Sequence, residues 1–143
     1  FPDFANYRRD GYDFDARYDE GLAKHTDKVL YDLLDSHAPI ISKELKKLGD
    51  YRKGGNKGFD TAIIRLQEQC YVITSNFAYM TDKNGQPYGW GVAEYSTPEK
   101  FMGAAFTDKV YQREPEESYQ LILDHLKKIL PQASMEQIKK ILK

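Results

Sequence analysis

Cysteine, tryptophan and long apolar runs are scarce in this chain of 143 residues. The single cysteine, Cys70, excludes an internal disulfide and is typical of a reducing compartment, so we expect a cytoplasmic protein. No segment approaches the roughly 20 apolar residues of a membrane-spanning helix. No basic segment followed by an apolar one marks a secretory signal. The composition therefore predicts a soluble protein with no membrane partner.

Residues suited to catalysis or metal binding are also few. The three histidines, His25, His37 and His125, have neither metal-ligand spacing nor a nucleophile beside them. The glycine-rich loop 54–58 lacks the Gly-Lys-Ser/Thr ending of a nucleotide-binding P-loop. The sequence contains no catalytic constellation, and it predicts no metal site and no cofactor.

The net charge of −1 gives no overall attraction to nucleic acid. Between Lys46 and Lys57, however, there are five basic residues and one acid, a local net charge of +4. Residues 1–24 carry four basic residues and six acids, a local net charge of −2. We therefore expect concentrated positive charge only in the segment from Lys46 to Lys57.

A helix is predicted at the centre of the chain, over residues 59–70. Its apolar residues fall at i, i+4, i+7 and i+11, on one face of a helix; they are Phe59, Ile63, Leu66 and Cys70. Asp60 is the expected N-cap, with Gly58 freeing the entry turn.

Two strand-like segments follow this helix with little linker. They span Tyr71–Met80 and Tyr88–Tyr95, and the turn between them contains Asn84 and Gly85. This residue pair is typical of a primed hairpin turn, because both residues tolerate positive φ. A β-hairpin is the prediction.

Two shorter helices precede the central one, and further helices follow the hairpin. The first begins at Thr26 or Asp27 and the second at about Ser42, ending at Gly49. The predicted fold class is mainly α with a β-hairpin (α+β), a winged helix-turn-helix with additional C-terminal helices. We expect the chain to consist of an arm (1–24), a winged helix (25–97) and C-terminal helices packed on the winged helix (98–143). We expect a common core, which comprises Leu30, Leu34, Leu45, Leu48, Phe59, Ile63, Leu66 and Trp90.

The arm is rich in tyrosine, arginine and aspartate. Gly11, Gly21 and the density of aspartates predict an irregular segment. Two roles stay open for it. Its rings and arginines would form a stacking surface for a nucleic-acid strand, or the rings would pack on the domain with Arg–Asp pairs at the rim.

The exposed face of the central helix is the candidate DNA-binding surface. In helix-turn-helix docking this face enters the major groove. There Arg65 would pair with guanine, Thr61 would contact a phosphate or a thymine methyl, and Ile64 would pack on a methyl group. Glu68 on the same face would oppose the phosphates. Cations of the preceding loop and of the hairpin turn would neutralise phosphates. The predicted DNA-contacting residues are Arg52, Lys53, Lys57, Thr61, Ile64, Arg65 and Lys83.

Three stretches resemble one known family. They are Phe1-Pro2-Asp3-Phe4 with the run from Arg8 to Tyr18, then Gly58–Thr61, and then Tyr88–Val92. They are similar to the bacterial AlkZ-related proteins, which are named after the AlkZ/YcaQ DNA glycosylases, winged-helix proteins that excise alkylated or cross-linked bases. The glycosylases use a Gln-x-Gln or Gln-x-Asp motif; Gln67-Glu68-Gln69 has this spelling but lies inside the predicted central helix, so the catalytic role does not transfer. The resemblance implies winged-helix architecture and an association with nucleic acid.

Members of that family usually carry more sequence upstream. Together with Phe1 in place of methionine, this predicts a fragment whose missing upstream region is a partner of the residues present. The leading hypothesis is a winged-helix protein that binds duplex DNA, with a role related to DNA repair. Two alternatives stay open: a winged-helix protein-interaction module without DNA binding, and part of a DNA glycosylase whose catalytic residues lie upstream. The sequence does not indicate an oligomeric state.

Overall fold

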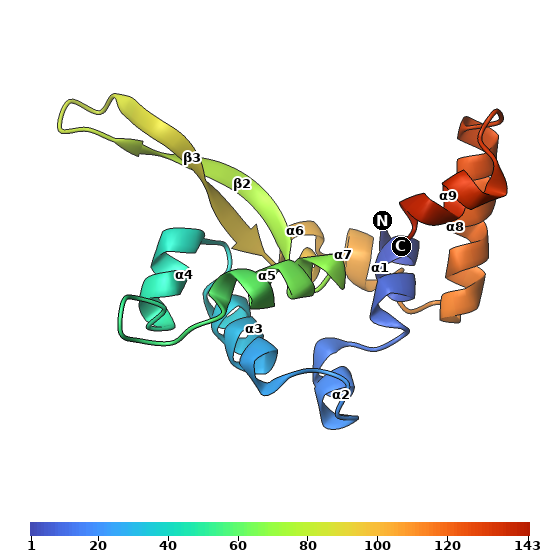
Figure 1. The fold of residues 1–143 in the computed structure, drawn as a ribbon, viewed down its shortest axis with the longest axis horizontal. Coiled ribbons are helices and arrows are strands. Elements are labelled where there is room, and N and C mark those ends of the chain that lie inside the picture. The colour runs from blue at the N-terminus through green and yellow to red at the C-terminus, as the bar shows by residue number, and fades with distance from the viewer.

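The computed structural model describes residues 1–143 and confirms a mainly helical α+β chain with one three-stranded antiparallel sheet (Figure 1). The elements in chain order are α1 (Pro2–Arg9), α2 (Phe14–Asp19), α3 (His25–His37), β1 (Ile40–Ile41), α4 (Ser42–Leu48), α5 (Phe59–Glu68), β2 (Ile73–Thr81), β3 (Pro87–Ser96), α6 (Pro98–Met102), α7 (Ala104–Thr107), α8 (Pro115–Ile129) and α9 (Met135–Ile141). None of these helices combines the length and the apolar character that a membrane span requires.

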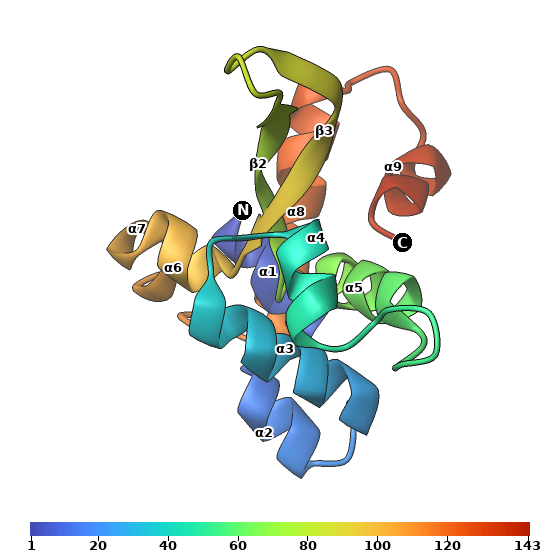
Figure 2. The same cartoon turned by 90° about the vertical axis from the view of Figure 1, so that its left-hand side faces the viewer.

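The molecule is elongated, with projecting elements at both ends of its long axis. The β2–β3 hairpin leaves one end of the body and α8 with α9 leaves the other (Figure 1). Figure 2 shows the hairpin and α8 extending in the same direction, with α2 and α3 on the opposite side. The helices α3, α4 and α5 lie at the base of the hairpin.

The main core lies between α3, α4, α5 and the base of the sheet. It contains six of the eight residues expected there, namely Leu30, Leu34, Leu45, Phe59, Ile63 and Leu66. The expectation was wrong for Leu48 and Trp90, which are both exposed. Leu48 stands in the last turn of the short helix α4, one turn past the buried Leu45. Trp90 lies on the part of the hairpin that projects beyond the body, where no neighbour covers it.

The sheet contains a strand that the sequence pattern does not predict. β1 has only two residues, too few for any alternation, and pairs with β3 through Ile40 opposite Tyr95. The predicted primed turn of the hairpin is also wrong. Only Gly85 has positive φ (77°), and Asp82 organises a longer turn in which its Oδ1 accepts hydrogen bonds from the backbone N–H of Asn84 and Gln86.

The N-terminal segment is helical rather than irregular. Pro2 stands at the start of α1, and the Asp13 side chain caps α2 by accepting a hydrogen bond from the Ala16 N–H at 2.8 Å. Proline fits the first turn because it lacks the backbone N–H that would be left unpaired there. Aspartate fits the N-cap because its carboxylate accepts a hydrogen bond from an N–H that has no partner within the helix. The ring of Phe14 is buried against Tyr31 and Tyr71, so the packing role of the arm is the one observed.

The central helix begins at Phe59, as expected, but Asp60 is not its N-cap and the helix ends earlier than expected. Gly58, with φ 86°, is the residue before its first turn, and Asp60 lies inside it. At the other end Cys70 adopts φ 61°, and the N–H of Tyr71 bonds to Leu66 O while that of Cys70 bonds to Gln67 O. This is a Schellman ending, which stops α5 at Glu68 and turns the chain into the hairpin.

Capping residues predict the C-terminal helices well. Thr97 caps α6 and Pro98 begins it, while Pro115 begins α8. Ser134 and Gln137 form a reciprocal capping box at the start of α9. The helices α8 and α9 share a small core of Leu123, Ile138 and Leu142.

The buried Tyr71 and the half-buried Tyr31 give a prediction for alkaline pH. Burial raises the pKa of Tyr31 and of Tyr71, which is about 10 in an unfolded chain. Their contribution to stability is therefore complete below about pH 10 and is lost as pH rises further, because the unfolded chain releases these protons first. In a titration followed by tyrosinate absorbance, we expect a late phase that coincides with the loss of helical circular dichroism. Tyr31→Phe should reduce the amplitude of that phase; titration of every tyrosine near pH 10 in a still-folded protein would contradict the prediction.

Candidate nucleic-acid interface

The basic loop between α4 and α5 is held in a defined turn. The Asn56 N–H donates to Asp50 O at 2.7 Å, and the Asn56 side-chain amide donates to Gly49 O at 2.9 Å. A Cβ on Gly55 would lie 2.1 Å from Asp50 O, so only glycine fits that close approach. These bonds close the loop although it contains three glycines.

The cations of this loop point to solvent. Arg52, Lys53 and Lys57 are all exposed, and their one ion pair is a contact of 3.6 Å between Arg52 and Asp50. The loop leads into the N-terminus of α5, where no side chain caps the first N–H groups. An uncapped helix N-terminus carries partial positive charge. Loop and helix terminus together therefore form one positive surface.

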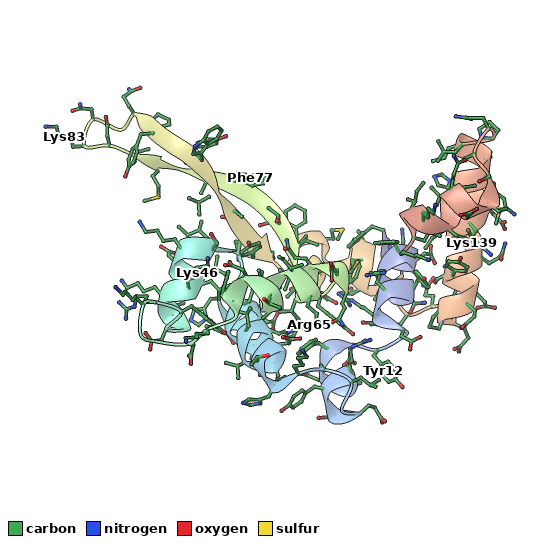
Figure 3. All side chains as sticks on the ribbon, viewed as in Figure 1. Tyr12, Lys46, Arg65, Phe77, Lys83 and Lys139 are labelled. Carbon is green, nitrogen blue, oxygen red and sulfur yellow. The ribbon has the colours of Figure 1, made fainter.

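Lys46 extends this surface along α4 but is partly neutralised. Its Nζ lies 3.0 Å from a carboxylate oxygen of Asp60 in the first turn of α5 and 4.7 Å from the centre of the Phe59 ring. Figure 3 shows Lys46 on α4, below the hairpin. The contact joins the two helices at an exposed edge, where such a pair contributes little to stability.

Arg65, predicted to contact guanine, is engaged inside the protein. Its Nε and Nη2 donate to the two carboxylate oxygens of Asp27 at 2.5 and 2.7 Å, and Asp27 is only 2% exposed. The hydrogen bonds with Asp27 raise the pKa of Arg65. The sequence places Asp27 on the same face of α3 as Leu30 and Leu34, and an acid on an apolar face signals such a buried pair.

The other predicted contact residues of α5 are accessible. Thr61 and Ile64 are exposed, one helical turn apart, and Glu68 is exposed one turn further on. The N-terminal helices leave this face open: Arg8 reaches only the C-terminal end of α5, where its Nε donates to Glu68 O at 2.7 Å. Accessible positive charge therefore lies in the loop before α5, whereas the exposed acids of the helix are Asp60 in its first turn and Glu68 at its end.

Lys83 lies apart from these residues. It is exposed at the tip of the hairpin, at the far end from the body, whereas Arg65 lies in the body (Figure 3). The structure thus brings together Arg52, Lys53 and Lys57 beside the exposed face of α5, and it places Lys83 on a separate projection.

Two surfaces of the structure have no counterpart among the sequence-based predictions. The first is a second concentration of charge: residues 127–143 contain five lysines and one acid, a net charge of +4, and Lys-Lys-Ile-Leu occurs twice in them. They belong to α8 and α9, at the opposite end of the long axis from α4 (Figure 1). The expectation of a single basic segment was therefore wrong.

The second missed surface is a group of exposed aromatic residues on the hairpin. Phe77, Tyr79, Tyr88 and Trp90 are 56–93% exposed. Of these four only Trp90 was expected in the core, and a projecting hairpin has no layer to cover either face. No group of three metal-ligating side chains occurs in the structure.

Comparison with known proteins gives one match. A family model described as AlkZ related matches residues 1–143, which include every element described above. No curated protein and no solved structure shows significant similarity to the chain.

Proposed function

Since this chain belongs to the AlkZ-related family, we propose that it is a winged-helix protein that binds duplex DNA through the basic loop and the N-terminal half of α5. The element order α3, β1, α4, α5, β2, β3 supports the winged-helix assignment, because three helices are interleaved with a three-stranded antiparallel sheet whose last two strands form a hairpin. The hairpin is then the wing, and α5 is the helix presented to DNA.

The exposed cations of the loop are the main observation that supports this proposal. Arg52, Lys53 and Lys57 stand beside an uncapped helix N-terminus, and backbone N–H groups together with basic side chains are the usual partners of phosphate oxygens. Such contacts position a protein on DNA and provide most of its salt-dependent affinity.

Base contacts are few in this arrangement. Because Arg65 is held by Asp27, the exposed face of α5 offers Thr61 and Ile64, whose methyl groups suit the methyl of thymine. We therefore propose binding with weak sequence preference, dominated by the phosphate backbone.

The test is a salt titration with charge variants. The variant with Arg52→Gln, Lys53→Gln and Lys57→Gln removes three phosphate contacts. The slope of log affinity against log salt should fall by about 2.7, at about 0.9 for each contact on duplex DNA. Between 50 and 200 mM salt, the affinity of the variant should then change roughly 40-fold less than that of the unmodified protein. Fluorescence anisotropy of a labelled duplex measures the affinity at each salt concentration and therefore also the slope.

A matched control removes the same charge elsewhere. Lys127→Gln, Lys128→Gln and Lys139→Gln take three positive charges from α8 and α9, and the titration should then keep the slope of the unmodified protein. Equal effects of the two triple variants would mean that net charge, and not the loop, governs binding. Absence of duplex binding by the unmodified protein would overturn the proposal and favour the protein-interaction alternative.

A further inference from the structure

The β2–β3 hairpin presents aromatic side chains that nothing in the protein covers. We infer that Phe77, Tyr79, Tyr88 and Trp90 stack unpaired bases, so that the preferred ligand is DNA in which a duplex adjoins unpaired nucleotides. This inference rests on the proposed function and narrows its ligand.

The exposure of these four rings is unlike that of the aromatic residues in the body. Trp90 is 93% exposed, and Phe77, Tyr79 and Tyr88 are 56–60% exposed. None of the four contacts another ring, whereas in the core Phe14 stacks on Tyr31 with ring centres 4.3 Å apart. Tyr88 pairs with Met80 and lies on one face of the hairpin, while Phe77 and Tyr79 lie on the other, so the exposed rings occupy both faces. Apolar surface left in water is characteristic of an interaction site. Trp90, the most exposed of the four, is free to accept a planar partner.

A β-bulge in β3 contains Trp90. Ala78 pairs with Val92 and Met80 with Tyr88, so three residues of β3 oppose the single residue Tyr79 of β2. These three residues are Gly89, Trp90 and Gly91, and Gly89 has φ 73°. Such a bulge bends a strand and redirects a side chain, and bulges often adjoin functional sites.

The second glycine of this bulge shapes the surface beside Trp90. A Cβ on Gly91 would lie 3.2 Å from Phe77 Cβ and 3.3 Å from Tyr79 Cζ. With glycine at this position, the Tyr79 ring and the Cβ of Phe77 lie close over β3. The bulge thus combines one fully projecting ring, that of Trp90, with the Tyr79 ring laid against the strand.

The helix α4 and the hairpin together carry four lysines and three acids, so the charge around the rings is slightly positive and suits nucleic acid better than an apolar protein partner. Lys83 is exposed at the tip, and α4, which packs against β3 at the base, carries the exposed Lys43 and Lys47. The acid of the turn, Asp82, uses its Oδ1 to accept two backbone hydrogen bonds. Proteins that bind single strands combine such cations, which follow the phosphates, with aromatic rings on which successive bases stack.

Trp90 is the only tryptophan of the chain and therefore reports on its own environment. The probes are a short duplex and the same duplex with an overhang of unpaired thymines. Stacking on the overhang should quench the Trp90 emission and shield it from acrylamide, and the plain duplex should do neither. Trp90→Ala should lower the affinity for the overhang ligand by about 5- to 150-fold, the range expected for one stacked base, and should leave duplex binding unchanged.

Phe101→Ala is the matched control, because Phe101 is an aromatic side chain of α6, outside the hairpin, and is 58% exposed. It should bind both ligands as the unmodified protein does. If the duplex is bound but Trp90 emission is unchanged, or if Trp90→Ala weakens both ligands equally, the stacking inference is overturned while the proposed function stands. Absence of binding to either ligand would overturn both.

Discussion

Replacing Arg9 by alanine is expected to lower the free energy of unfolding by about 3–5 kcal/mol, the cost of truncating a large, fully buried side chain to alanine. Arg9 is completely buried. Its guanidinium donates to Glu99 Oε1 at 2.6 Å, to Cys70 O at 2.7 Å and to the Tyr111 hydroxyl at 2.8 Å. Alanine would leave these acceptors without their donor and would leave a cavity in place of the side chain.

The guanidinium also lies among aromatic rings. Its central carbon is 4.6 Å from the centre of the Tyr71 ring and 5.1 Å from that of Phe106. A desolvated cation over a ring is favourable by about 2 kcal/mol or more. Arg9 thereby joins α1 to the start of the hairpin segment and to α7, which are far apart in the sequence.

Urea denaturation of three variants separates these contributions. Arg9→Met fills most of the volume without the charge and should cost less than Arg9→Ala, since Glu99 is partly exposed and can reach water. Arg9→Lys keeps the charge but loses the branched geometry that reaches three acceptors, and it should lie between them. A loss below about 1 kcal/mol for Arg9→Ala, the net value of a single ordinary hydrogen bond, would contradict this account.

Replacing Asp27 by alanine is expected to change stability and DNA binding in opposite directions. The buried carboxylate accepts two charge-assisted hydrogen bonds from Arg65, so its loss should cost about 2–3 kcal/mol. Arg65 is itself partly exposed and can turn toward solvent, which keeps the cost below that of a fully buried pair. The released guanidinium adds one cation to the face of α5, and the salt slope of duplex binding should rise by about 0.9.

The control for this variant is Asp32→Asn, which removes one exposed acid from the same helix. It changes the net charge equally but leaves Arg65 paired, so it should alter neither unfolding nor the salt slope appreciably. If Asp27→Ala and Asp32→Asn raise the slope by the same amount, the gain comes from net charge and not from Arg65. An unchanged free energy of unfolding for Asp27→Ala would show that the pair does not stabilise the fold.

Features encoded within a few residues were predictable from the sequence alone. The spacing of Phe59, Ile63 and Leu66 identified the buried face of α5, and Ser134 with Gln137 identified the start of α9. These signals are local, because a helical stripe repeats within one or two turns and a capping box spans four residues. The order of helices and hairpin followed from them, and with it the α+β class.

The partners of individual side chains were decided only by the tertiary structure. Arg65 has the position of a DNA-contacting residue on its helix, yet Asp27, 38 residues away in sequence, binds it. Arg9 belongs to a segment that its composition presents as irregular and solvated, yet it is buried because α7 and the end of α5 surround it. Trp90 has the residue type and alternation of a core position, yet it is exposed because its strand extends past the body. Burial and pairing depend on which distant elements meet, and that is a property of the packed chain rather than of any short stretch of it.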